Sequence, residues 1–366
     1  MGKDTAKAAV MTAQRRPMEM IRYPIPTPAP GTILVRVVCC TICGSDIHSW
    51  SGRRSSPVPV ILGHEIVGSI IAMGEGVQSD AGDRPLAPGD RITWTIADNC
   101  GKCYYCREKH LPMKCRRLKK YGHDSCDTPP HLMGGFAEIC HIGPGTGVVK
   151  IPDEIPDTVA SPANCALATV VAGWEAGRIR AFENVLVQGA GALGIYAAAL
   201  ASHCGCRRVI VTDVQEPRLK VARAFGATDT INVGGMTPEQ CAGAVRDLTG
   251  GFGVDCAMEV AGAPELIPAG LACLRTGGRY VEIGNSFPGA VFSYDASDII
   301  WRRLTICGVH NYDTAHLQQA IDFLAAAARK FPFEKIVTRR YPLEEVNEAM
   351  EAAASGEFIR VAVIPE

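Results

Sequence analysis

The sequence predicts an α/β protein of two domains, in which a strand-rich domain is followed by a doubly wound parallel sheet. Three observations support this prediction. The first part of the chain contains β-branched runs separated by Gly and Pro, the second part alternates strand and helix patterns, and a glycine-rich turn joins a strand to a helix in that second part. A chain of 366 residues is long enough for two domains with substantial cores.

The strand-rich part extends to about residue 165. The runs ILVRVVCCTI (33–42) and EIVGSIIAMG (65–74) are rich in β-branched residues, and Gly- and Pro-containing segments separate them. No helix of convincing length is expected here, except for a turn after Cys43. This texture predicts short strands joined by loops.

From about Cys165 the pattern changes to alternating strands and helices, which implies a parallel sheet with helices on both faces. The tail (333–366) adds a strand, an amphipathic helix and a last strand. The expected strands of the parallel sheet are VLVQ (185–188), RVIVTD (208–213), VDCAMEV (254–260) and RYVEIG (279–284), and the expected helices are IYAAALASHC (195–204), PRLKVARAFG (217–226) and ELIPAGLACL (265–274).

Charge and targeting signals narrow the class of protein. The 37 Lys and Arg residues nearly balance the 38 Asp and Glu residues, so nothing suggests nucleic acid or a charged membrane as a partner. The N-terminal segment has no continuous apolar core of the kind found in a signal peptide, and Ala6 stands where a myristoylation signal requires Ser or Thr. We therefore expect a cytoplasmic protein whose sixteen cysteines are metal ligands or buried thiols rather than disulfides.

The segment Gly189–Gly194 matches G-x-G-x-x-G and predicts a dinucleotide site formed by Gly189, Gly191, Leu193 and Gly194. It follows a strand pattern and opens a helix, where free N–H groups and the helix dipole favour a pyrophosphate. Asp213 closes the next strand, and a carboxylate there binds ribose hydroxyls and repels the additional phosphate of NADP. NAD is therefore favoured, although Arg218 complicates that preference. The alternative is a tight turn in an α/β domain that binds no nucleotide.

Four cysteines, Cys100, Cys103, Cys106 and Cys115, have the spacing C-x2-C-x2-C-x8-C. A disulfide cluster, an iron–sulfur site and a zinc site are the alternatives. A ferredoxin-type run would continue with x3-C-P, which this sequence does not, and a nucleic-acid zinc ribbon would have two separated CxxC pairs.

A second set of possible metal ligands comprises Cys43 in CGSDIH, His64 in GHE and Cys165 in PANC. Two cysteines and a histidine are natural zinc ligands, and three protein ligands leave a fourth position open for substrate. Spacing alone does not bring these residues together. On composition, two buried thiols and a core histidine is the simpler interpretation.

Nearly the whole chain nevertheless resembles the zinc-dependent medium-chain alcohol dehydrogenase family, within the medium-chain dehydrogenase/reductase superfamily. The motifs CGSDIH, GHE and GDR (89–91), the four-cysteine lobe and the glycine-rich turn occur in that family's order. The resemblance implies a GroES-like catalytic domain over 1–166 and 309–366, with a structural zinc lobe at about 98–116. It implies a Rossmann NAD-binding domain over 167–308.

The resemblance also implies a role for each site residue. Two zinc ions are expected per chain, a catalytic one on Cys43, His64 and Cys165 and a structural one on Cys100, Cys103, Cys106 and Cys115. The gap before Cys115 is one residue longer than is usual in the family, so a small bulge is expected. Asp46 would fix the ring of His64, and Glu65 would lie behind the metal. Ser45 would accept the substrate proton and pass it through the cofactor ribose to His48. Thr169 would press on the nicotinamide, and Arg360 would reach the pyrophosphate.

These roles describe an enzyme that transfers a hydride between an alcohol, or its aldehyde or ketone, and NAD, with the alkoxide formed on zinc. Some members of the wider superfamily lack zinc and act as quinone reductases or as non-catalytic proteins. The complete ligand set, together with Ser45 and His48, argues against that alternative.

The substrate is less well defined. Segments such as LPMKCRRLKKYGH (111–123) resemble dehydrogenases found with phosphonate catabolism, which would imply a hydroxyalkylphosphonate bound by the basic run 116–123, whose His123 is also of interest. The simpler interpretation is that the run is a solvated, cationic loop. The substrate would then be a neutral secondary or cyclic alcohol or a polyol, with Trp94 as either a pocket wall or a core residue. The resemblance also implies an oligomer. We expect a homodimer or homotetramer, with the segment 279–295 contributing to its interface.

Overall fold

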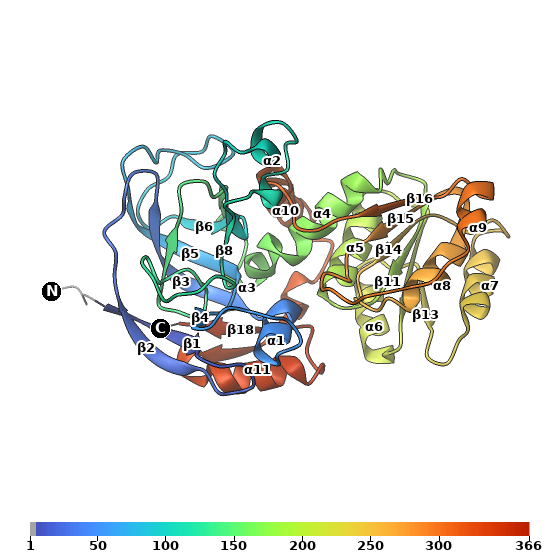
Figure 1. Ribbon diagram of the computed structural model, residues 1–366. Coiled ribbons are helices and arrows are strands. Elements are labelled where there is room, and N and C mark those ends of the chain that lie inside the picture. Colours follow the sequence, from blue (N-terminus) through green and yellow to red (C-terminus); the bar gives the residue numbers. More distant parts are fainter. Residues whose placement is uncertain (1–4, 366) are drawn as a thin grey trace. The chain divides into compact units, whose positions relative to one another are not determined.

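The computed structural model describes residues 5–365, so the expectations for residues 1–4 and 366 lie outside the described part. The chain forms two compact units (Figure 1). The β-rich unit comprises residues up to 168, 311–326 and 333 onward, and the parallel-sheet unit comprises 169–310 and 327–332. These boundaries differ by two residues from the expected ones at both junctions. Residues 327–332 also belong to the parallel-sheet unit, because Phe331 stacks on Phe225 there with ring centroids 6.3 Å apart.

The β-rich unit contains a seven-stranded sheet of order β10-β6-β5-β3-β18-β17, with β9 also paired to β3. Smaller sheets have the orders β2-β1-β4 and β7-β8. The C-terminal strand β18 pairs with β3 through Ala362 and Thr41, so the tail completes the sheet that begins near the N-terminus. The strands are β1 (Thr5–Met11), β2 (Glu19–Pro24), β3 (Ile33–Thr41), β4 (Val60–Ile61), β5 (Glu65–Met73), β6 (Arg91–Trp94), β7 (Ala97–Asp98), β8 (Lys119–Lys120), β9 (Ile139–Ile142), β10 (Val148–Lys150), β17 (Val337–Pro342) and β18 (Arg360–Ile364).

Helices in this first region are short, as the absence of long apolar periodicity predicts. They are α1 (Gly44–Trp50), α2 (Tyr104–Arg107) and α3 (Asp157–Ala160), with 3-10 turns η1 (Pro112–Lys114) and η2 (Ser161–Asn164). The longer helix α4 (Ala166–Ala176) starts in the β-rich unit, and the tail supplies α10 (Thr314–Ala327), η3 (Phe333–Lys335), η4 (Leu343–Glu345) and α11 (Val346–Ala354).

Trp94 belongs to the core of the β-rich unit. Its side chain is 0% exposed and packs edge-on against Tyr121, with ring centroids 6.1 Å apart. Of the two interpretations offered for Trp94 by the sequence, the structure therefore supports the core residue and not the pocket wall.

The second unit is a six-stranded parallel sheet of order β13-β12-β11-β14-β15-β16. The order reverses between β11 and β14, which is where doubly wound sheets bind their ligands. Its strands are β11 (Asn184–Gln188), β12 (Arg208–Asp213), β13 (Asp229–Asn232), β14 (Val254–Glu259), β15 (Leu274–Glu282) and β16 (Thr305–Gly308). Its helices are α5 (Ala192–His203), α6 (Glu216–Ala224), α7 (Pro238–Leu248), α8 (Leu266–Cys273) and α9 (Ala296–Trp301).

The expected strands and helices of this sheet are all present, but β13, α7, α9 and β16 were not among them. β13 has only four residues, too few for a clear period. α7 begins with a capping box, which is a signal that can be recognised in the sequence. The Thr237 hydroxyl accepts a hydrogen bond from the backbone N–H of Gln240, and the Gln240 side chain accepts one from the backbone N–H of Thr237.

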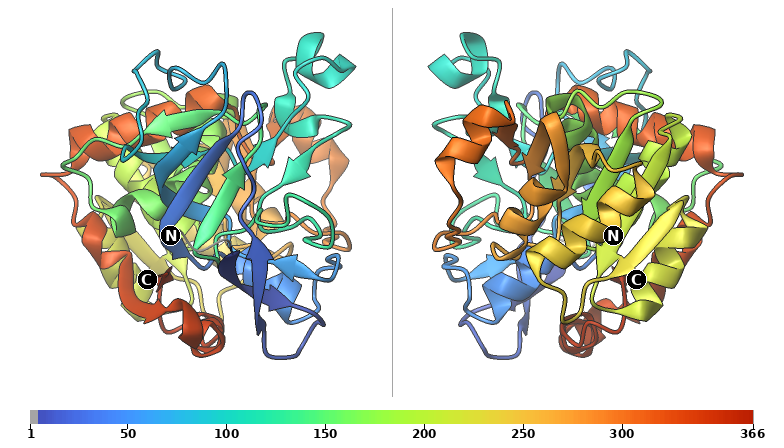
Figure 2. Two further views of the ribbon diagram at one scale, coloured as in Figure 1. Left: turned by 90° about the vertical axis from the view of Figure 1, so that its left-hand side faces the viewer. Right: turned by 90° about the vertical axis from the view of Figure 1, so that its right-hand side faces the viewer.

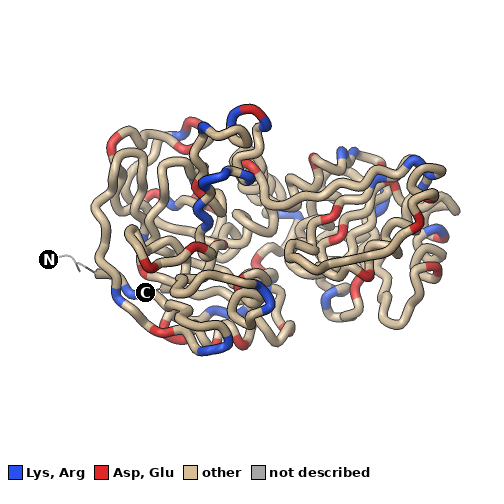
Figure 3. Tube along the Cα trace, viewed as in Figure 1, with Lys and Arg blue, Asp and Glu red and all other residues tan. Residues whose placement is uncertain are grey.

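Two surface features bear on function, a projecting segment and the distribution of charge. The segment containing α2 and η1 projects from the rest of the β-rich unit, as Figure 2 shows in both views. Acidic and basic residues are interspersed along the chain rather than collected into one large block of a single sign (Figure 3). Among residues 5–365, no helix combines the length and apolarity needed to cross a membrane.

Candidate active site

The fold brings Cys43, His64 and Cys165 together, although 122 positions separate the two cysteines in sequence. Cys43 follows β3 and precedes α1, His64 precedes the neighbouring strand β5, and Cys165 lies between η2 and α4. Their ligand atoms all lie within 4.8 Å of one another, and the two Sγ atoms are 3.9 Å apart. Tetrahedral zinc with bonds of about 2.3 Å to sulfur places two sulfurs about 3.8 Å apart, so this donor set fits zinc.

Asp46 fixes the orientation of this cluster. Its carboxylate is completely buried, and Oδ1 lies 3.2 Å from His64 Nδ1. The same carboxylate accepts hydrogen bonds from the backbone N–H groups of Cys43 at 2.9 Å and Gly63 at 3.2 Å. Because Nδ1 of His64 is occupied by Asp46, Nε2 is the ring atom that remains for a metal.

The two cysteines can supply a thiolate, which is the form that binds metal. The hydrogen bond between the Cys165 and Cys43 sulfurs lowers the pKa of Cys43 well below its usual range, with His64 and Arg360 adding to the effect. The same hydrogen bond, together with burial, raises the pKa of Cys165.

Glu65 and Arg360 form a buried ion pair behind the cluster. Arg360 Nε lies 3.1 Å from Glu65 Oε2, and Arg360 Nη2 lies 3.2 Å from Glu65 Oε1. Thr41 Oγ1 also donates to this carboxylate, at 2.6 Å. Arg360 Nη2 is 3.9 Å from Cys43 Sγ, so this arginine lies beside the metal ligands, and its predicted contact with the pyrophosphate stays a prediction.

Residues that the sequence did not single out hold the ligand-bearing loops in place. Ser161 Oγ donates to the carbonyl of Glu65 at 2.7 Å. The Asn164 amide donates to the carbonyls of His64 and Trp94, both at 2.9 Å. Asn164 directly precedes Cys165 in the PANC segment, and that adjacency was the available signal.

Ser45 and His48 lie on α1 with i, i+3 spacing, which places them on one side of the helix. Ser45 Oγ is 3.4 Å from His64 Nε2, next to the position where the three ligand atoms converge. Burial and the nearby charge of Arg53 lower the pKa of His48 below 6.5, so its imidazole is neutral and can accept a proton at neutral pH.

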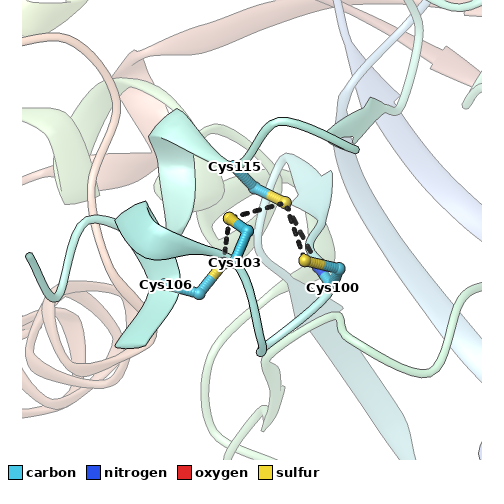
Figure 4. A group of neighbouring side chains, drawn as sticks. All are labelled: Cys100, Cys103, Cys106 and Cys115. Carbon is cyan, nitrogen blue, oxygen red and sulfur yellow. Dashed lines mark hydrogen bonds between the residues drawn. The ribbon is translucent and has the colours of Figure 1, made fainter. Parts of the chain in front are cut away.

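The four cysteines of the lobe form a second cluster, in which the ligand atoms of Cys100, Cys103, Cys106 and Cys115 again lie within 4.8 Å of one another (Figure 4). Sγ of Cys115 is 3.4 Å from that of Cys100 and 3.9 Å from that of Cys103. The backbone N–H groups of Cys100 and Arg117 both donate to Cys115 Sγ at 3.3 Å.

The additional residue before Cys115 does not separate that cysteine from the others. The ligand atoms of all four cysteines still converge, and His110 between α2 and η1 has a left-handed backbone with φ of +52°. Four cysteine sulfurs that converge in this way suit a closed structural zinc site.

The glycine-rich turn in the parallel-sheet unit connects β11 to α5. Gly189 has φ of +106°, and a Cβ at Gly194 would lie 1.8 Å from the Gly189 carbonyl oxygen, so neither position accepts a larger residue. Gly191 has open space around its Cβ position, at the N-terminus of α5, where a phosphate would fit. Leu193 is half-buried in the first turn of that helix.

Asp213 lies at the end of β12 beside the same turn. Its Oδ2 accepts from the N–H of Ala190 at 2.7 Å and its Oδ1 from the N–H of Gln215 at 2.8 Å. The carboxylate is therefore held at the edge of the turn, the place where a ribose binds in sheets of this kind. Thr169 lies on α4, four residues after Cys165.

The basic run divides into an exposed part and a part beside the metal ligands. Arg116, Arg117 and Lys119 are exposed. His123 is buried, with its ring centroid 4.9 Å from that of His64. The interpretation of the run as a solvated loop therefore holds for its first part and not for its end.

Two family models match the chain. The alcohol dehydrogenase GroES-like domain matches residues 29–153, and the zinc-binding dehydrogenase domain matches residues 192–326. The chain is 32% identical over 363 residues to 5-exo-hydroxycamphor dehydrogenase of Pseudomonas putida, with 97% of each chain covered. It is 31% identical over 350 residues to L-threonine 3-dehydrogenase of Aeromonas hydrophila, covering 93% of this chain and 94% of that one.

Solved structures agree with these matches. An alcohol dehydrogenase from Thermotoga maritima superimposes with a TM-score of 0.93 at 30% identity, covering 99% of this chain and 100% of that one. A zinc-binding dehydrogenase homologue from Sinorhizobium meliloti, solved with NADP, has a TM-score of 0.87 at 29% identity, covering 99% and 100% of the two chains. The family resemblance and the fold class predicted from the sequence are thereby confirmed: the chain belongs to the zinc-dependent medium-chain alcohol dehydrogenase family and is an oxidoreductase of GroES-like and Rossmann architecture.

Proposed function

We propose that this enzyme oxidises an alcohol at Cys43, His64 and Cys165, with NAD as the hydride acceptor. The observation that carries the proposal is the convergence of these three ligand atoms within 4.8 Å, next to the Ser45 hydroxyl. A zinc ion held there would lower the pKa of the substrate hydroxyl, and bound NAD would take up the hydride.

The chain's own residues handle the proton. Ser45 Oγ, which is 3.4 Å from His64 Nε2, is the proposed acceptor of the hydroxyl proton. His48, kept neutral because burial lowers its pKa, takes a proton from the site and releases it to solvent. Asp46 and Glu65 hold the ligands in place through the contacts with His64, Cys43 and Arg360.

Cofactor binding is assigned to the parallel-sheet unit. The N–H groups of the glycine-rich turn, Gly189–Gly194, would hold the pyrophosphate, and Asp213 would hold the adenosine ribose. Thr169 is proposed to contact the nicotinamide, and Arg360 the pyrophosphate. The carboxylate of Asp213 supports NAD over NADP, although the Sinorhizobium meliloti homologue was solved with NADP.

Two substrate classes are proposed. A hydroxyalkylphosphonate is suggested by the motifs around the basic run, whose last residue, His123, has its ring centroid 4.9 Å from that of His64. A neutral secondary or cyclic alcohol is suggested by the match to hydroxycamphor dehydrogenase. The threonine dehydrogenase matches leave the choice open, because their named substrate is an alcohol that also carries a carboxylate.

The test is NAD reduction by the purified protein with 2-hydroxyethylphosphonate and with neutral alcohols of similar size, before and after treatment with a zinc chelator. Activity that the chelator abolishes is expected. Cys43→Ser should reduce kcat by about 10³-fold or more while NAD binding is retained, because one ligand of the open site is lost. Turnover that survives both the chelator and this substitution would contradict the proposal.

Two further expectations belong with this function. A homodimer or homotetramer is proposed, formed through the end of the parallel sheet, where β16 is the last strand and the predicted segment 279–295 begins in its neighbour β15. A cytoplasmic location is proposed because all sixteen cysteines are free thiols and both metal clusters require reduced sulfur.

A further inference from the structure

Two adjacent lysines on β8 face opposite sides of their strand. β8 pairs with β7 through Ala97 and Lys120 and through Asp98 and Lys119. Because side chains alternate along a strand, the exposed Lys119 and the half-buried Lys120 lie on opposite sides of β8. The inner side of this strand therefore carries a single cation, Lys120.

The segment that carries Lys120 is packed directly on the loop that carries His64. At Gly122, which has φ of +72°, a Cβ would lie 2.7 Å from the carbonyl oxygen of Gly63. The next residue, His123, places its ring centroid 4.9 Å from that of His64. These contacts fix the backbone around Lys120 with respect to the catalytic ligands.

No carboxylate neutralises Lys120 within the described residues 5–365, where none of the ion pairs includes it. The carboxylate nearest in sequence, Asp124, accepts a hydrogen bond from the backbone N–H of Lys120 at 2.9 Å instead. The charges that act on its ammonium are those of Arg54 and Lys114, which repel it, and the sulfurs of Cys165 and Cys43, which attract it. A zinc ion on those sulfurs would offset their attraction, because two thiolates and one Zn²⁺ have no net charge.

A buried ammonium without a counter-ion is costly unless a ligand supplies the missing charge. Burial, followed by the charge of Arg54, lowers the pKa of Lys120 to about 8, which is the expected consequence of such a site. Because the segment that carries Lys120 packs on the His64 loop, this cation is placed to recognise a substrate.

We propose that Lys120 binds an anionic group on the alcohol substrate, so that the enzyme acts on small hydroxy acids with a carboxylate or phosphonate near the reacting hydroxyl. This inference rests on the proposed function, because it assigns the charge of the substrate at the same site. The basic residues Arg116, Arg117 and Lys119 are exposed and take no part in it.

The test compares each anionic alcohol with its neutral ester. The pairs are 2-hydroxyethylphosphonate with its dimethyl ester, and 3-hydroxypropionate with its methyl ester, so the phosphonate and carboxylate arms are distinguished. Wild-type enzyme should prefer the anion in at least one pair. Lys120→Met should lower kcat/KM for that anion by about 100-fold, mainly through KM, and change the matching ester by less than about twofold, because a charge-assisted hydrogen bond is lost only with the anion.

Two variants serve as controls. Lys119→Met removes the neighbouring lysine on the outer side of the same strand and should leave both members of each pair unchanged. Lys120→Arg should keep most of the preference for the anion. A preference of the wild-type enzyme for both esters, or an equal loss of ester and anion in Lys120→Met, would overturn the inference.

The wild-type protein provides a test that does not depend on any variant folding correctly. Ethylphosphonate and propionate carry the two anions without the hydroxyl, and at least one of them should competitively inhibit oxidation of the neutral ester that matches it. The absence of inhibition by both would overturn the role of Lys120. Zinc-dependent oxidation of the ester would still support the proposed function in that case, so failure of the one can be distinguished from failure of the other.

Discussion

Glu259 is a carboxylate in an unusual position at the end of β14. It is completely buried, and its Oε1 accepts hydrogen bonds from the N–H groups of Ala261 and Gly262, both at 2.8 Å. The Asn285 amide bridges it to Glu282, at 3.2 Å from Glu259 Oε2 and 2.9 Å from Glu282 Oε1. Burial and the charge of Glu282 raise the pKa of the Glu259 carboxyl from 4.5 to about 7.

This pKa predicts that the contribution of Glu259 to the stability of the enzyme falls as pH rises from about 4.5 to 7. Over that range folded Glu259 keeps a proton that the unfolded chain has released, so the free energy of unfolding decreases by about 1.4 kcal/mol per pH unit from this group. Glu282→Gln removes the like charge and should gain stability relative to wild type as pH approaches 7. Melting temperatures measured across this range test the prediction, and the exposed Glu265→Gln serves as control. A difference between Glu282→Gln and wild type that stays constant with pH would contradict it.

At the scale of single residues, the sequence predicts the possible metal ligands better than it predicts the residues that hold those ligands in place. Cys43, His64 and Cys165 were identified through a family resemblance, because cysteine and histidine in those motifs are typical of the family's zinc ligands. Asn164 carries no comparable signal, since its role depends on two carbonyl groups that only the folded chain brings within 2.9 Å. The burial of Lys120 next to the exposed Lys119 also required the register of β8.

The projecting lobe between Cys100 and Cys115 is the element most dependent on metal. Within it Met113 and Cys115 are the buried residues, so there is little apolar surface to stabilise α2 and η1. A closed zinc site would supply the missing stability, as in small metal-dependent domains.

Cys103→Ser is therefore expected to halve the zinc content, from two ions per chain to one, and to loosen this lobe. Trypsin should then cleave at the exposed Lys102, Arg107 or Lys109 at least about tenfold faster, because local unfolding exposes these sites. Cys204→Ser, a half-buried thiol outside both clusters, is the matched control. A change in kcat that is as large as the change in cleavage rate would argue against a purely structural role.

Whole elements were predictable where the pattern was long and its boundary residues were distinctive. β3, β5, β11 and β12 follow their β-branched runs closely, and the turn before α5 follows its glycines. β7 and β8 have two residues each, too few to show the alternation of apolar and polar residues that predicts a strand. Their pairing depends on how the segments on either side of the four-cysteine lobe fold.

At the scale of the whole molecule, the chain leaves the β-rich unit and returns to it, and only long-range pairing could establish this. β18 pairs with β3 more than 300 residues earlier, and it pairs in parallel with β17 through the crossover helix α11. The sequence predicted strands in the tail, but hydrophobic periodicity does not name the sheet that a strand joins. The family resemblance supplied that information.

The edge of the parallel sheet indicates how copies of this chain would associate. β16 pairs with β15 on one side only, and within the described residues no strand covers its other side. Ile306 on this strand is 40% exposed, and Ile300 and Trp301 on the preceding helix α9 are 73% and 80% exposed. An edge strand with this much apolar surface is an aggregation hazard for a monomer, and a second copy paired edge to edge would cover it.

Trp301→Glu should therefore reduce the molar mass measured by light scattering from a dimer or higher oligomer toward the 39.0 kDa of one chain. A buried unpaired carboxylate at each copy of the interface would oppose association. Phe182→Glu is the matched control, since Phe182 is 76% exposed but precedes β11 in the middle of the sheet. An unchanged mass for Trp301→Glu, or an equal loss of mass in both variants, would show that this edge is not the interface.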